Sequence, residues 1–437
     1  MDSLRITYVL PVYWPVIGGC ELHTHELVKR LCEKHAVNVI TLISNQKDKE
    51  RGREFWHSCI LSAPPTPEIY YDHKATVTRM ALTPYGKYFL YLLLRLQSPR
   101  LPGKLRRYAM NLFANFYKRK LMNTIGECDV IHGIHGDVSW ISYAALRVAR
   151  ERGIPFVYTP VSHIFQKEKV LNHSYMNTSS LHIANLPMST RGPVNEIWLK
   201  TCYEADALLT MTEFERNFFL ENNINTSAHT IGVGPIVSER PPENFKERYG
   251  IKYNRMVLFL GRNNRDKGIL EILLATRLVW EKFPDTCFLF AGPMEWGIEE
   301  LFHRYQDSRI ITLGPLDVHE KSAALKACDI LCVPSVTESL GGVYLEAWFY
   351  GKPIIGADIL SSREINENGK GGLLVKPSPD EIAKALRFLL ENPTIREKMG
   401  GWGRQRVLER YTWENISGKV EKIYYTLLSK NQNLSRQ

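Results

Sequence analysis

The chain has 437 residues, a formal net charge of +10, 44% hydrophobic residues and 23% charged residues. This balance excludes a chain that is mostly disordered, collagen-like or of low complexity. No run approaches the roughly 18 apolar residues of a spanning helix, and eight scattered cysteines without a CxxC pair indicate buried thiols in a reducing compartment. At roughly 150 residues per domain, two or three domains are expected.

Short apolar runs alternate with helical patterns through the first half of the chain. The first run, soon after Met1, is predicted to be a core strand and not a cleaved signal. The predicted strands of this half cover residues 6–10, 37–43, 129–132, 156–158, 207–211 and 228–231. Alternation of strands and helices predicts an α/β domain with a parallel sheet and helices on both faces.

A mostly polar stretch over residues 234–253 is the best candidate for a linker, and a second alternating series follows it. Its predicted strands cover residues 256–260, 287–291, 310–313, 330–334 and 353–356, with helices starting near Gly268, Ile298, Glu320 and Val343. The chain is therefore predicted to contain two doubly wound halves. Ligands of such sheets bind beyond the carboxyl ends of the strands, so the expected site is a cleft between the halves.

The strongest motif spans residues 334–347, where a buried strand is followed by a glycine turn and a helix. Gly341 and Gly342 open that helix, whose free N–H groups and positive dipole end favour a bound anion. Glu338 precedes the turn and Glu346 lies inside the helix, so two carboxylates can accept hydrogen bonds from ligand hydroxyls. Without this context, the two glutamates would indicate only solvated side chains.

Three weaker motifs also follow predicted strands. Arg262 and Lys267 flank a turn where they could grip a diphosphate, although a solvated basic turn is the simpler interpretation. Gly18 and Gly19 let a backbone approach a ligand, but the GxGxxG spacing of dinucleotide sites is missing. His132 and His135 close another strand without a cysteine or histidine cluster, so zinc is not expected there.

Asp-x-Asp occurs nowhere in the chain. A nucleotide-sugar enzyme that holds its diphosphate through a carboxylate-bound metal would be expected to carry such a pair. We therefore expect no metal and no cofactor, with basic side chains and helix dipoles neutralising the diphosphate instead.

Together these segments resemble the retaining glycosyltransferases of family 4 (glycosyl transferases group 1), which have the GT-B fold. Residues 334–347 followed by 351–353 are similar to the E-x7-E region of that family, and residues 261–268 are similar to its phosphate loop. The resemblance implies two Rossmann-like domains facing each other across a cleft. It implies an acceptor domain over residues 1–235, a nucleotide-sugar donor domain over 236–410, and a helix over 411–437 that packs back on the first domain.

The resemblance also implies a role for each matching residue. Glu338 and His135 would be catalytic, contacting the donor sugar at the reacting face. The implied donor-binding residues are Gly18, Gly19, Arg262, Lys267, Ser339, Leu340, Gly341, Val343 and Glu346. Arg262 and Lys267 would stabilise the leaving diphosphate, and Glu346 would bind the ribose hydroxyls. Retention would follow from a front-face substitution in which the leaving phosphate helps to deprotonate the acceptor.

The sequence departs from the family pattern at three places. The usual His-x-His is spaced here as His132-x-x-His135, and His135 is favoured because it lies nearer the loop. A Gly-x-Gly is reduced to Gly292-Pro293, and the residues after the first glutamate are Ser339-Leu340. The nucleotide base, the sugar, the linkage and the acceptor stay open, as does the oligomeric state.

Basic charge is concentrated in one segment: residues 87–120 contain nine lysines or arginines and no acidic residue. Aromatic and aliphatic side chains accompany them over residues 85–120, a combination that suits an anionic membrane surface, although ordinary core residues beside a solvated face would look similar. We expect a cytoplasmic protein, peripheral on the cytoplasmic face of a membrane if this segment docks. No recognisable module supports nucleic-acid binding.

The expected activity is therefore a hexosyltransferase that uses a nucleotide-diphosphate sugar and a lipid-linked or saccharide acceptor. The alternatives are a nucleotide-sugar epimerase of the same fold and a non-catalytic scaffold associated with a membrane. An epimerase would release sugar and nucleotide without an acceptor. A scaffold would be expected to lack Arg262, Lys267, Glu338 and Glu346, all of which are present.

Overall fold

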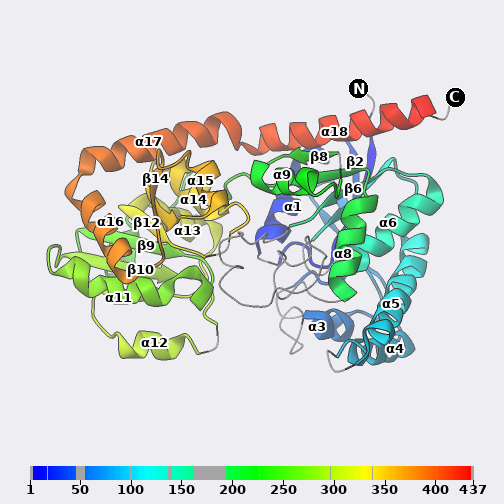
Figure 1. Cartoon of the computed structure of the whole chain (residues 1–437), viewed down its shortest axis with the longest axis horizontal. Helices are drawn as coiled ribbons and strands as arrows, with labels where there is room; N and C mark the ends of the chain where they lie inside the picture. The colour runs from blue at the N-terminus through cyan, green and yellow to red at the C-terminus, as the bar shows by residue number, and fades with distance from the viewer. Residues whose placement is uncertain are drawn as a thin grey trace. The chain divides into compact units, whose positions relative to one another are not determined.

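The computed structural model, shown in Figure 1, describes most of the chain. The described residues are 3–16, 18–45, 55–98, 101–135, 140–161, 193–225, 227–295, 297–336 and 338–434. The chain divides into two compact units: unit 1 comprises Met1–Gly232 with Trp413–Gln437, and unit 2 comprises Val233–Thr412. The domain boundaries expected from the sequence, at residues 235 and 411, lie within a few residues of the points where the chain passes from one unit to the other.

Unit 1 contains an eight-stranded sheet in the order β3-β4-β2-β1-β5-β6-β7-β8. Its strands are β1 (Arg5–Val9), β2 (Ala36–Thr41), β3 (Glu68–Asp72), β4 (Ala75–Arg79), β5 (Val130–Ile134), β6 (Phe156–Thr159), β7 (Ala207–Thr210) and β8 (Ala228–Thr230). Neighbouring strands pair in parallel, except that β3 and β4 form an antiparallel hairpin. The predicted parallel pairing is confirmed for the other strands, and the antiparallel hairpin at this edge was not predicted.

The hairpin lacked a strong sequence signal because β3 is an edge strand. Its side chains Ile69 and Tyr71 are exposed, and Asp72 is its only buried residue, so it has no continuous apolar run. Parallel strands buried on both faces produce such runs, whereas an edge strand needs none.

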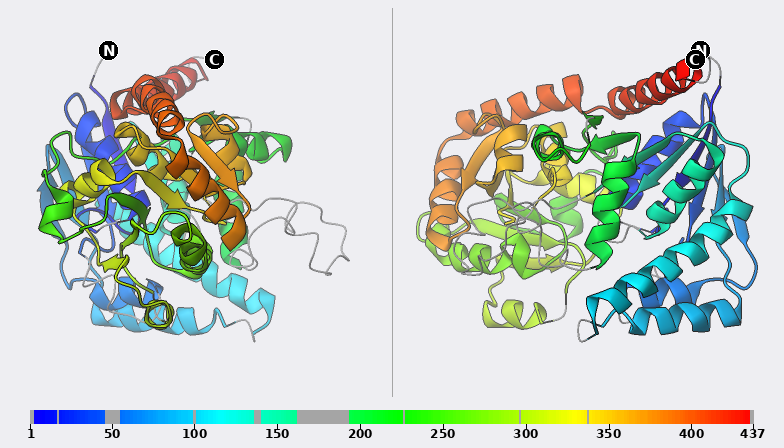
Figure 2. Two further views of the ribbon diagram at one scale, coloured as in Figure 1. Left: turned by 90° about the vertical axis from the view of Figure 1, so that its left-hand side faces the viewer. Right: turned by 45° about the vertical axis from the view of Figure 1, so that its right-hand side comes forward.

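The helices of unit 1 cover the two faces of its sheet (Figures 1 and 2). They are α1 (Gly19–Leu31), α3 (Phe55–Ser62), α4 (Pro84–Arg95), α5 (Gly103–Thr124), α6 (Trp140–Arg152), α8 (Pro193–Glu204), α9 (Glu213–Glu221) and α18 (Trp413–Leu434). Side chains alternate across a strand, and β1 and β5 illustrate the consequence. Val9 and Ile131 join the core cluster with α5 and α6, whereas Tyr8 and His132 contact Tyr424 of α18.

Unit 2 contains a six-stranded parallel sheet in the order β11-β10-β9-β12-β13-β14. Its strands are β9 (Arg255–Leu260), β10 (Thr286–Ala291), β11 (Ile310–Leu313), β12 (Ile330–Val333), β13 (Ile354–Ala357) and β14 (Gly372–Val375). Numbered from β9, this is the doubly wound order 3-2-1-4-5-6. The five predicted strands are confirmed in place, and β14 was missed.

The helical segments of unit 2 follow the strands in the expected alternation. They are α10 (Phe245–Arg248), the 3-10 turn η3 (Arg265–Lys267), α11 (Ile269–Trp280), α12 (Glu299–Arg304), α13 (Val318–Ala327), α14 (Gly342–Phe349), α15 (Leu360–Ile365), α16 (Pro379–Glu391) and α17 (Pro393–Arg410). Helix α10 lies within the stretch 234–253, so that stretch is not the simple linker that its polar composition indicated. Its buried Phe245 anchors the segment to unit 2.

Candidate functional site

The strand order of unit 2 reverses between β9 and β12, and the turns after these two strands pack against each other. The backbone N–H of Val336 donates to the carbonyl of Asp266 at 3.0 Å. A Cβ added to Gly268 would lie 2.8 Å from the ring of Pro334, so only glycine allows this approach. The two motifs singled out in the sequence thus meet at the topological switch point, where doubly wound sheets bind ligands.

The turn after β9 holds Lys267 in a defined position. The side chain of Asn264 accepts a hydrogen bond from the Lys267 backbone N–H at 3.1 Å and so caps η3. The buried side chain of Asn263 donates to the carbonyl of Gly292 at 3.0 Å and ties the turn to the end of β10. These two hydrogen bonds fix the backbone of the turn and so the position from which the Lys267 side chain extends.

Lys267 and Glu338 contact each other directly. The Lys267 ammonium forms an ion pair and hydrogen bond with the Glu338 carboxylate, and both side chains are largely removed from solvent. The Glu338 carbonyl accepts a hydrogen bond from Ser361 at 3.0 Å. An acid and a base predicted from separate motifs therefore form one charged pair.

Arg262 does not join this pair. Its guanidinium lies 3.5 Å from a carboxylate oxygen of Glu295, and the side chain is 65% exposed. An exposed pair at this distance stabilises the protein little, so the arginine can exchange Glu295 for a bound anion at small cost. Glu295 was not foreseen, because it follows a different strand.

Helix α14 begins at a glycine that the local geometry requires. Gly341 has φ of +80°, and a Cβ there would lie 2.7 Å from the ring of Tyr344. The Tyr344 hydroxyl donates to the carbonyl of Val333 at 2.6 Å and locks the helix onto β12. Leu340 is buried beneath the turn, while Ser339 and Val343 are partly exposed around the helix N-terminus.

Glu346 lies on the same helix and is 8% exposed. The ammonium of Lys321, on α13, lies 2.6 Å from a carboxylate oxygen of Glu346. The sequence analysis missed Lys321 because its partner is 25 positions away on another helix. Each of the two predicted carboxylates therefore has a lysine partner.

The glycine turn of unit 1 lies at its own switch point, where the strand order reverses between β1 and β5. Gly18 and Gly19 form the start of α1. A Cβ on Gly18 would lie 2.2 Å from the carboxylate of Glu21, whereas one on Gly19 would meet nothing within 4 Å. Because the contact at Gly18 is with the end of a glutamate side chain, the backbone geometry requires glycine at neither position.

His132, within β5, and His135, just after it, lie in different surroundings. His132 is fully buried, with its ring nitrogens 2.6 Å from the Tyr424 hydroxyl and 2.8 Å from the Thr159 hydroxyl. Burial lowers its pKa to about 3, so it stays neutral. His135 is only partly buried, follows the strand, and its carbonyl accepts a hydrogen bond from Tyr158 at 2.6 Å. His132 is thus committed to the core, and His135 is placed at the strand end.

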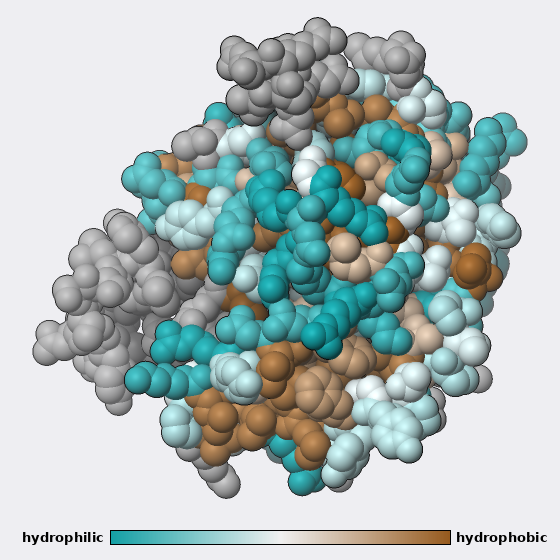
Figure 3. All heavy atoms as spheres, turned by 90° about the vertical axis from the view of Figure 1, so that its right-hand side faces the viewer, coloured by the Kyte–Doolittle hydropathy of each residue, from teal (hydrophilic) through white to brown (hydrophobic). Residues whose placement is uncertain are grey.

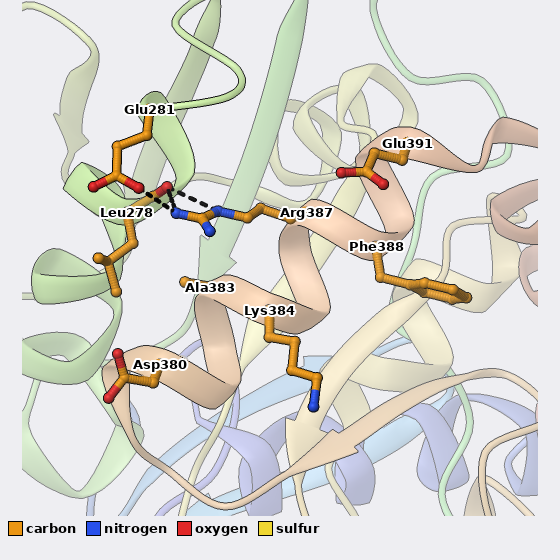
Figure 4. Close-up of a pocket in the computed structure, with 8 residues that line it drawn as sticks. All are labelled: Leu278, Glu281, Asp380, Ala383, Lys384, Arg387, Phe388 and Glu391. Atoms are coloured by element: carbon orange, nitrogen blue, oxygen red, sulfur yellow. Dashed lines mark hydrogen bonds and ion pairs between the residues drawn. The ribbon is translucent and has the colours of Figure 1, made fainter.

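Unit 2 also has a pocket away from these turns, between α11 and α16, shown in Figure 4. Arg387 crosses it to reach the carbonyl of Leu278 and the carboxylate of Glu281, each at 2.8 Å. None of the predicted site residues lines it. Since its central cation is already paired, the pocket adds nothing to the candidate site.

Two family models match the chain and together span most of it. The model described as Glycosyltransferase Family 4 matches residues 17–234, and the model described as Glycosyl transferases group 1 matches residues 242–406. A phosphatidyl-myo-inositol mannosyltransferase of Mycobacterium leprae is 32% identical over 191 residues, covering 42% of this chain and 50% of that protein. A D-inositol 3-phosphate glycosyltransferase of Corynebacterium urealyticum is 32% identical over 202 residues, covering 44% and 47%. The chain spans about half the length of the curated relatives it matches.

Solved structures match over nearly the whole chain. A sucrose-phosphate synthase from Thermosynechococcus elongatus superposes with a TM-score of 0.70 at 18% identity, covering 98% of this chain and all (100%) of that one. The HepE protein of Anabaena, in complex with UDP and glucose, gives 0.69 at 16% identity, covering 97% and 100%. These likenesses confirm the GT-B fold class, with two Rossmann-like sheets.

Proposed function

The chain belongs to the family 4 glycosyltransferases (glycosyl transferases group 1), and we propose that it transfers a sugar from a nucleoside-diphosphate sugar to a hydroxyl group of an acceptor. The observation that carries the proposal is the contact between Lys267 and Glu338 at the switch point of unit 2. It brings a diphosphate-binding cation and a sugar-binding carboxylate within reach of one ligand.

Lys267 and Arg262 neutralise the diphosphate as it leaves. When the bond between the sugar and the phosphate breaks, negative charge grows on the phosphate oxygens, and cations that are already in place lower the barrier. Lys267 turns from Glu338 to the diphosphate, and the freed carboxylate accepts hydrogen bonds from sugar hydroxyls. Arg262 leaves Glu295 in the same way.

The start of α14 and its buried glutamate hold the rest of the donor. The N-terminus of α14 directs its backbone N–H groups and the positive end of its dipole toward an anion. Glu346, less than two turns into the helix, accepts hydrogen bonds from the ribose hydroxyls. The ion pair with Lys321 holds this carboxylate in place.

We assign His135, with Gly18 and Gly19, to the donor from unit 1 on the family resemblance. The reaction proceeds with retention: the acceptor oxygen bonds to the anomeric carbon on the face that the phosphate leaves, and the phosphate takes the acceptor proton. The commitment of both His132 nitrogens to Tyr424 and Thr159 supports His135 as the active histidine.

Catalysis is proposed to need no metal, since Lys267 and Arg262 supply the charge that a metal would. Transfer activity should therefore survive thorough EDTA treatment when it is measured well below the unfolding temperature. The measurement is the rate of sugar transfer before and after treatment, with ionic strength held constant. Strict and reversible dependence on added Mg²⁺ or Mn²⁺ would contradict the proposal.

The acceptor is proposed to be lipid-linked and reached from a membrane surface. Exposed apolar side chains form a stripe on α4 at helical spacing and continue on α5. This α4–α5 surface consists of Tyr85, Tyr88, Phe89, Leu92, Leu105 and Tyr108. Figure 3 shows a hydrophobic area in the lower part of the face it views, at the height of α4 and α5 in Figure 1. Among the described residues, no helix is long and apolar enough to span a bilayer.

A product screen tests the proposed function. Purified protein is incubated with UDP-, GDP- and ADP-sugars against lipid-linked and soluble saccharide acceptors, and products are identified by mass spectrometry. Transfer with one donor and one acceptor class is the expected result. Release of nucleotide and of a sugar epimeric to that of the donor, at an unchanged rate without acceptor, would instead identify an epimerase. No turnover of any donor, with no nucleotide binding, would favour a scaffold.

A further inference from the structure

Three side chains with metal-ligand chemistry meet in unit 1, at a place that the proposed donor site does not use. His25 comes from the middle of α1, Asp72 ends β3, and His73 begins the two-residue turn into β4. One ligand atom from each lies within 4.8 Å of those from the other two. Residues 47 positions apart thus form one cluster, which the local sequence pattern could not show.

The carboxylate of Asp72 lies between the two imidazoles. His25 Nδ1 lies 2.7 Å from Oδ2 of Asp72, and His73 Nε2 lies 4.0 Å from Oδ1. The His25 and Asp72 side chains are 12% and 8% exposed, while that of His73 is 44% exposed. Two of the three groups are therefore held inside the protein, and the third leaves a side open to solvent.

Neighbouring groups fix His25 and Asp72, the two less exposed members. The ring of Trp14 stacks on His25 with centroids 4.6 Å apart and an interplanar angle of 22°. The Tyr13 hydroxyl donates to Oδ2 of Asp72 at 2.6 Å. Burial by itself would raise the pKa of Asp72, but hydrogen bonds from His25 and Tyr13 outweigh it and hold that pKa below its ordinary value. The carboxylate is thus held in a fixed orientation, as a metal ligand must be.

We propose that His25, Asp72 and His73 together bind one divalent transition-metal ion, with zinc as the probe. Two imidazoles and one carboxylate are donors that suit zinc and its neighbours, whereas Mg²⁺ and Ca²⁺ prefer oxygen ligands. The ion takes the place of the proton between His25 and Asp72, which is released. Water completes the coordination on the side that the exposed His73 leaves open.

A metal at this cluster would join α1 to the β3–β4 hairpin. In the described part of the chain, the hydrogen bond between His25 and Asp72 joins this helix to β3, the edge strand of the sheet. The same ion would stiffen the segment that carries Tyr13 and Trp14, which leads into the glycine turn at the start of α1. Its role is thus to stabilise unit 1, separate from the metal-free chemistry proposed for the donor turns.

The alternative is a network of hydrogen bonds that needs no metal. His25, Asp72 and Tyr13 already satisfy one another in that case, and His73 is a solvated turn residue. The alternative predicts that substitution of His73 changes nothing about zinc binding. The effect of a His73 substitution on zinc binding therefore distinguishes the two interpretations.

The test is a zinc titration of the full-length, chelator-stripped protein against a chromogenic competitor. The wild type should bind one more zinc ion per chain than His73→Ala, with no matching site for Mg²⁺. Tyr13→Phe removes the hydrogen bond that the Tyr13 hydroxyl donates to Asp72. Loss of a hydrogen bond that orients a metal ligand should weaken zinc binding roughly 10- to 100-fold. His303→Ala is the matched control, since His303 is exposed in unit 2 and should leave binding unchanged.

Zinc should also raise the unfolding temperature of the wild type and of His303→Ala, but not of His73→Ala. Because His73 is exposed, its loss should leave the metal-free fold intact, which circular dichroism verifies. Equal zinc binding by wild type and His73→Ala, or no stoichiometric binding at all, would overturn the proposal. Neither result depends on glycosyl transfer, so it leaves the proposed function untouched.

Discussion

At the scale of single residues, the charged groups of the donor turns are held in pairs. Lys267 pairs with Glu338 and Lys321 pairs with Glu346, both away from bulk water, whereas Arg262 and Glu295 form an exposed pair. Removing one residue of a largely buried ion pair destabilises the protein, because the charge of the other residue is left without a partner. Substitutions at these lysines must therefore be compared with a neighbouring basic residue that has no such role.

Lys267→Ala should lower kcat/KM, because one contact to the leaving diphosphate is lost. The expected loss of transition-state stabilisation is on the order of 2–4 kcal/mol. The measurement is steady-state transfer with the donor found in the product screen. Arg265→Ala is the control, because Arg265 is an exposed cation in the same turn and should retain near-normal activity. Lys267→Arg, which keeps the charge beside Glu338, should fold normally and recover part of the rate. Wild-type turnover by folded Lys267→Ala would remove the lysine from the mechanism.

Two buried histidines make the stability of unit 1 depend on pH. Burial lowers the pKa of His23 to about 4 and that of His132 to about 3, from 6.5. Their stabilising effect is therefore complete above pH 6.5 and is lost as pH falls, because the unfolded chain binds protons that the folded unit excludes. The free energy of unfolding should fall by up to about 1.4 kcal/mol per pH unit for each histidine.

Urea unfolding between pH 7 and pH 5 measures this dependence. His23→Leu should reduce the slope, since one of the two titrating groups is removed, whereas His303→Ala should leave it unchanged. Neither ring nitrogen of His23 has a hydrogen-bond partner in the described part of the chain, so leucine leaves no new polar group unsatisfied. A slope in His23→Leu equal to that of the wild type would show that this histidine does not contribute.

At the scale of elements, the sequence predicted what local patterns encode. The strands and turns that carry Lys267, Glu338 and Gly341 were predictable, because each motif lies within one strand–turn–helix unit. Contacts between distant segments were not: the Lys321–Glu346 pair joins two helices, and the His25–Asp72 pair joins a helix to an edge strand. The hairpin itself was missed because an exposed edge strand carries neither a buried run nor a turn glycine.

Gly341→Ala tests whether the start of α14 must have its observed geometry. A residue with a Cβ at φ of +80° costs about 1–2 kcal/mol, and contact with the Tyr344 ring adds to it. We expect a lower unfolding temperature together with weaker nucleotide binding, measured by calorimetry. Gly401→Ala is the control: it lies in α17 with open space around it, and should stabilise the protein by about 0.4–1 kcal/mol. Unimpaired nucleotide binding by Gly341→Ala would argue against a helix-terminus anion site.

At the scale of the whole molecule, the net charge of +10 raises the question of where the excess acts. The described basic residues on α5 differ in their surroundings. Lys118 is paired with Glu151, and Arg106 is partly buried. Lys104, Arg107 and Arg119 are exposed on α5, the helix that carries Leu105 and Tyr108 of the α4–α5 surface.

An apolar stripe beside exposed cations is the arrangement of a helix pair that lies at the boundary of lipid headgroups. Tyr85, Tyr88 and Tyr108 are 89%, 67% and 62% exposed, so burial in a membrane would remove much aromatic surface from water. Each exposed lysine or arginine near an anionic surface adds about 1 kcal/mol of attraction, which salt weakens. The protein should therefore sediment with anionic vesicles at low salt, less at high salt, and little with neutral vesicles.

Two sets of substitutions separate the contributions to this docking. Charge reversal at Lys104, Arg107 and Arg119 should abolish binding to anionic vesicles without loss of the fold, since these side chains are exposed. Tyr85→Ser with Tyr88→Ser should weaken binding at every salt concentration, because it removes the apolar contribution and leaves the charge. The control is charge reversal at Arg265 and Lys252, exposed cations of unit 2, which should leave sedimentation unchanged. If the wild type stays in the supernatant with anionic vesicles at low salt, the docking proposal fails, and a soluble saccharide becomes the better acceptor.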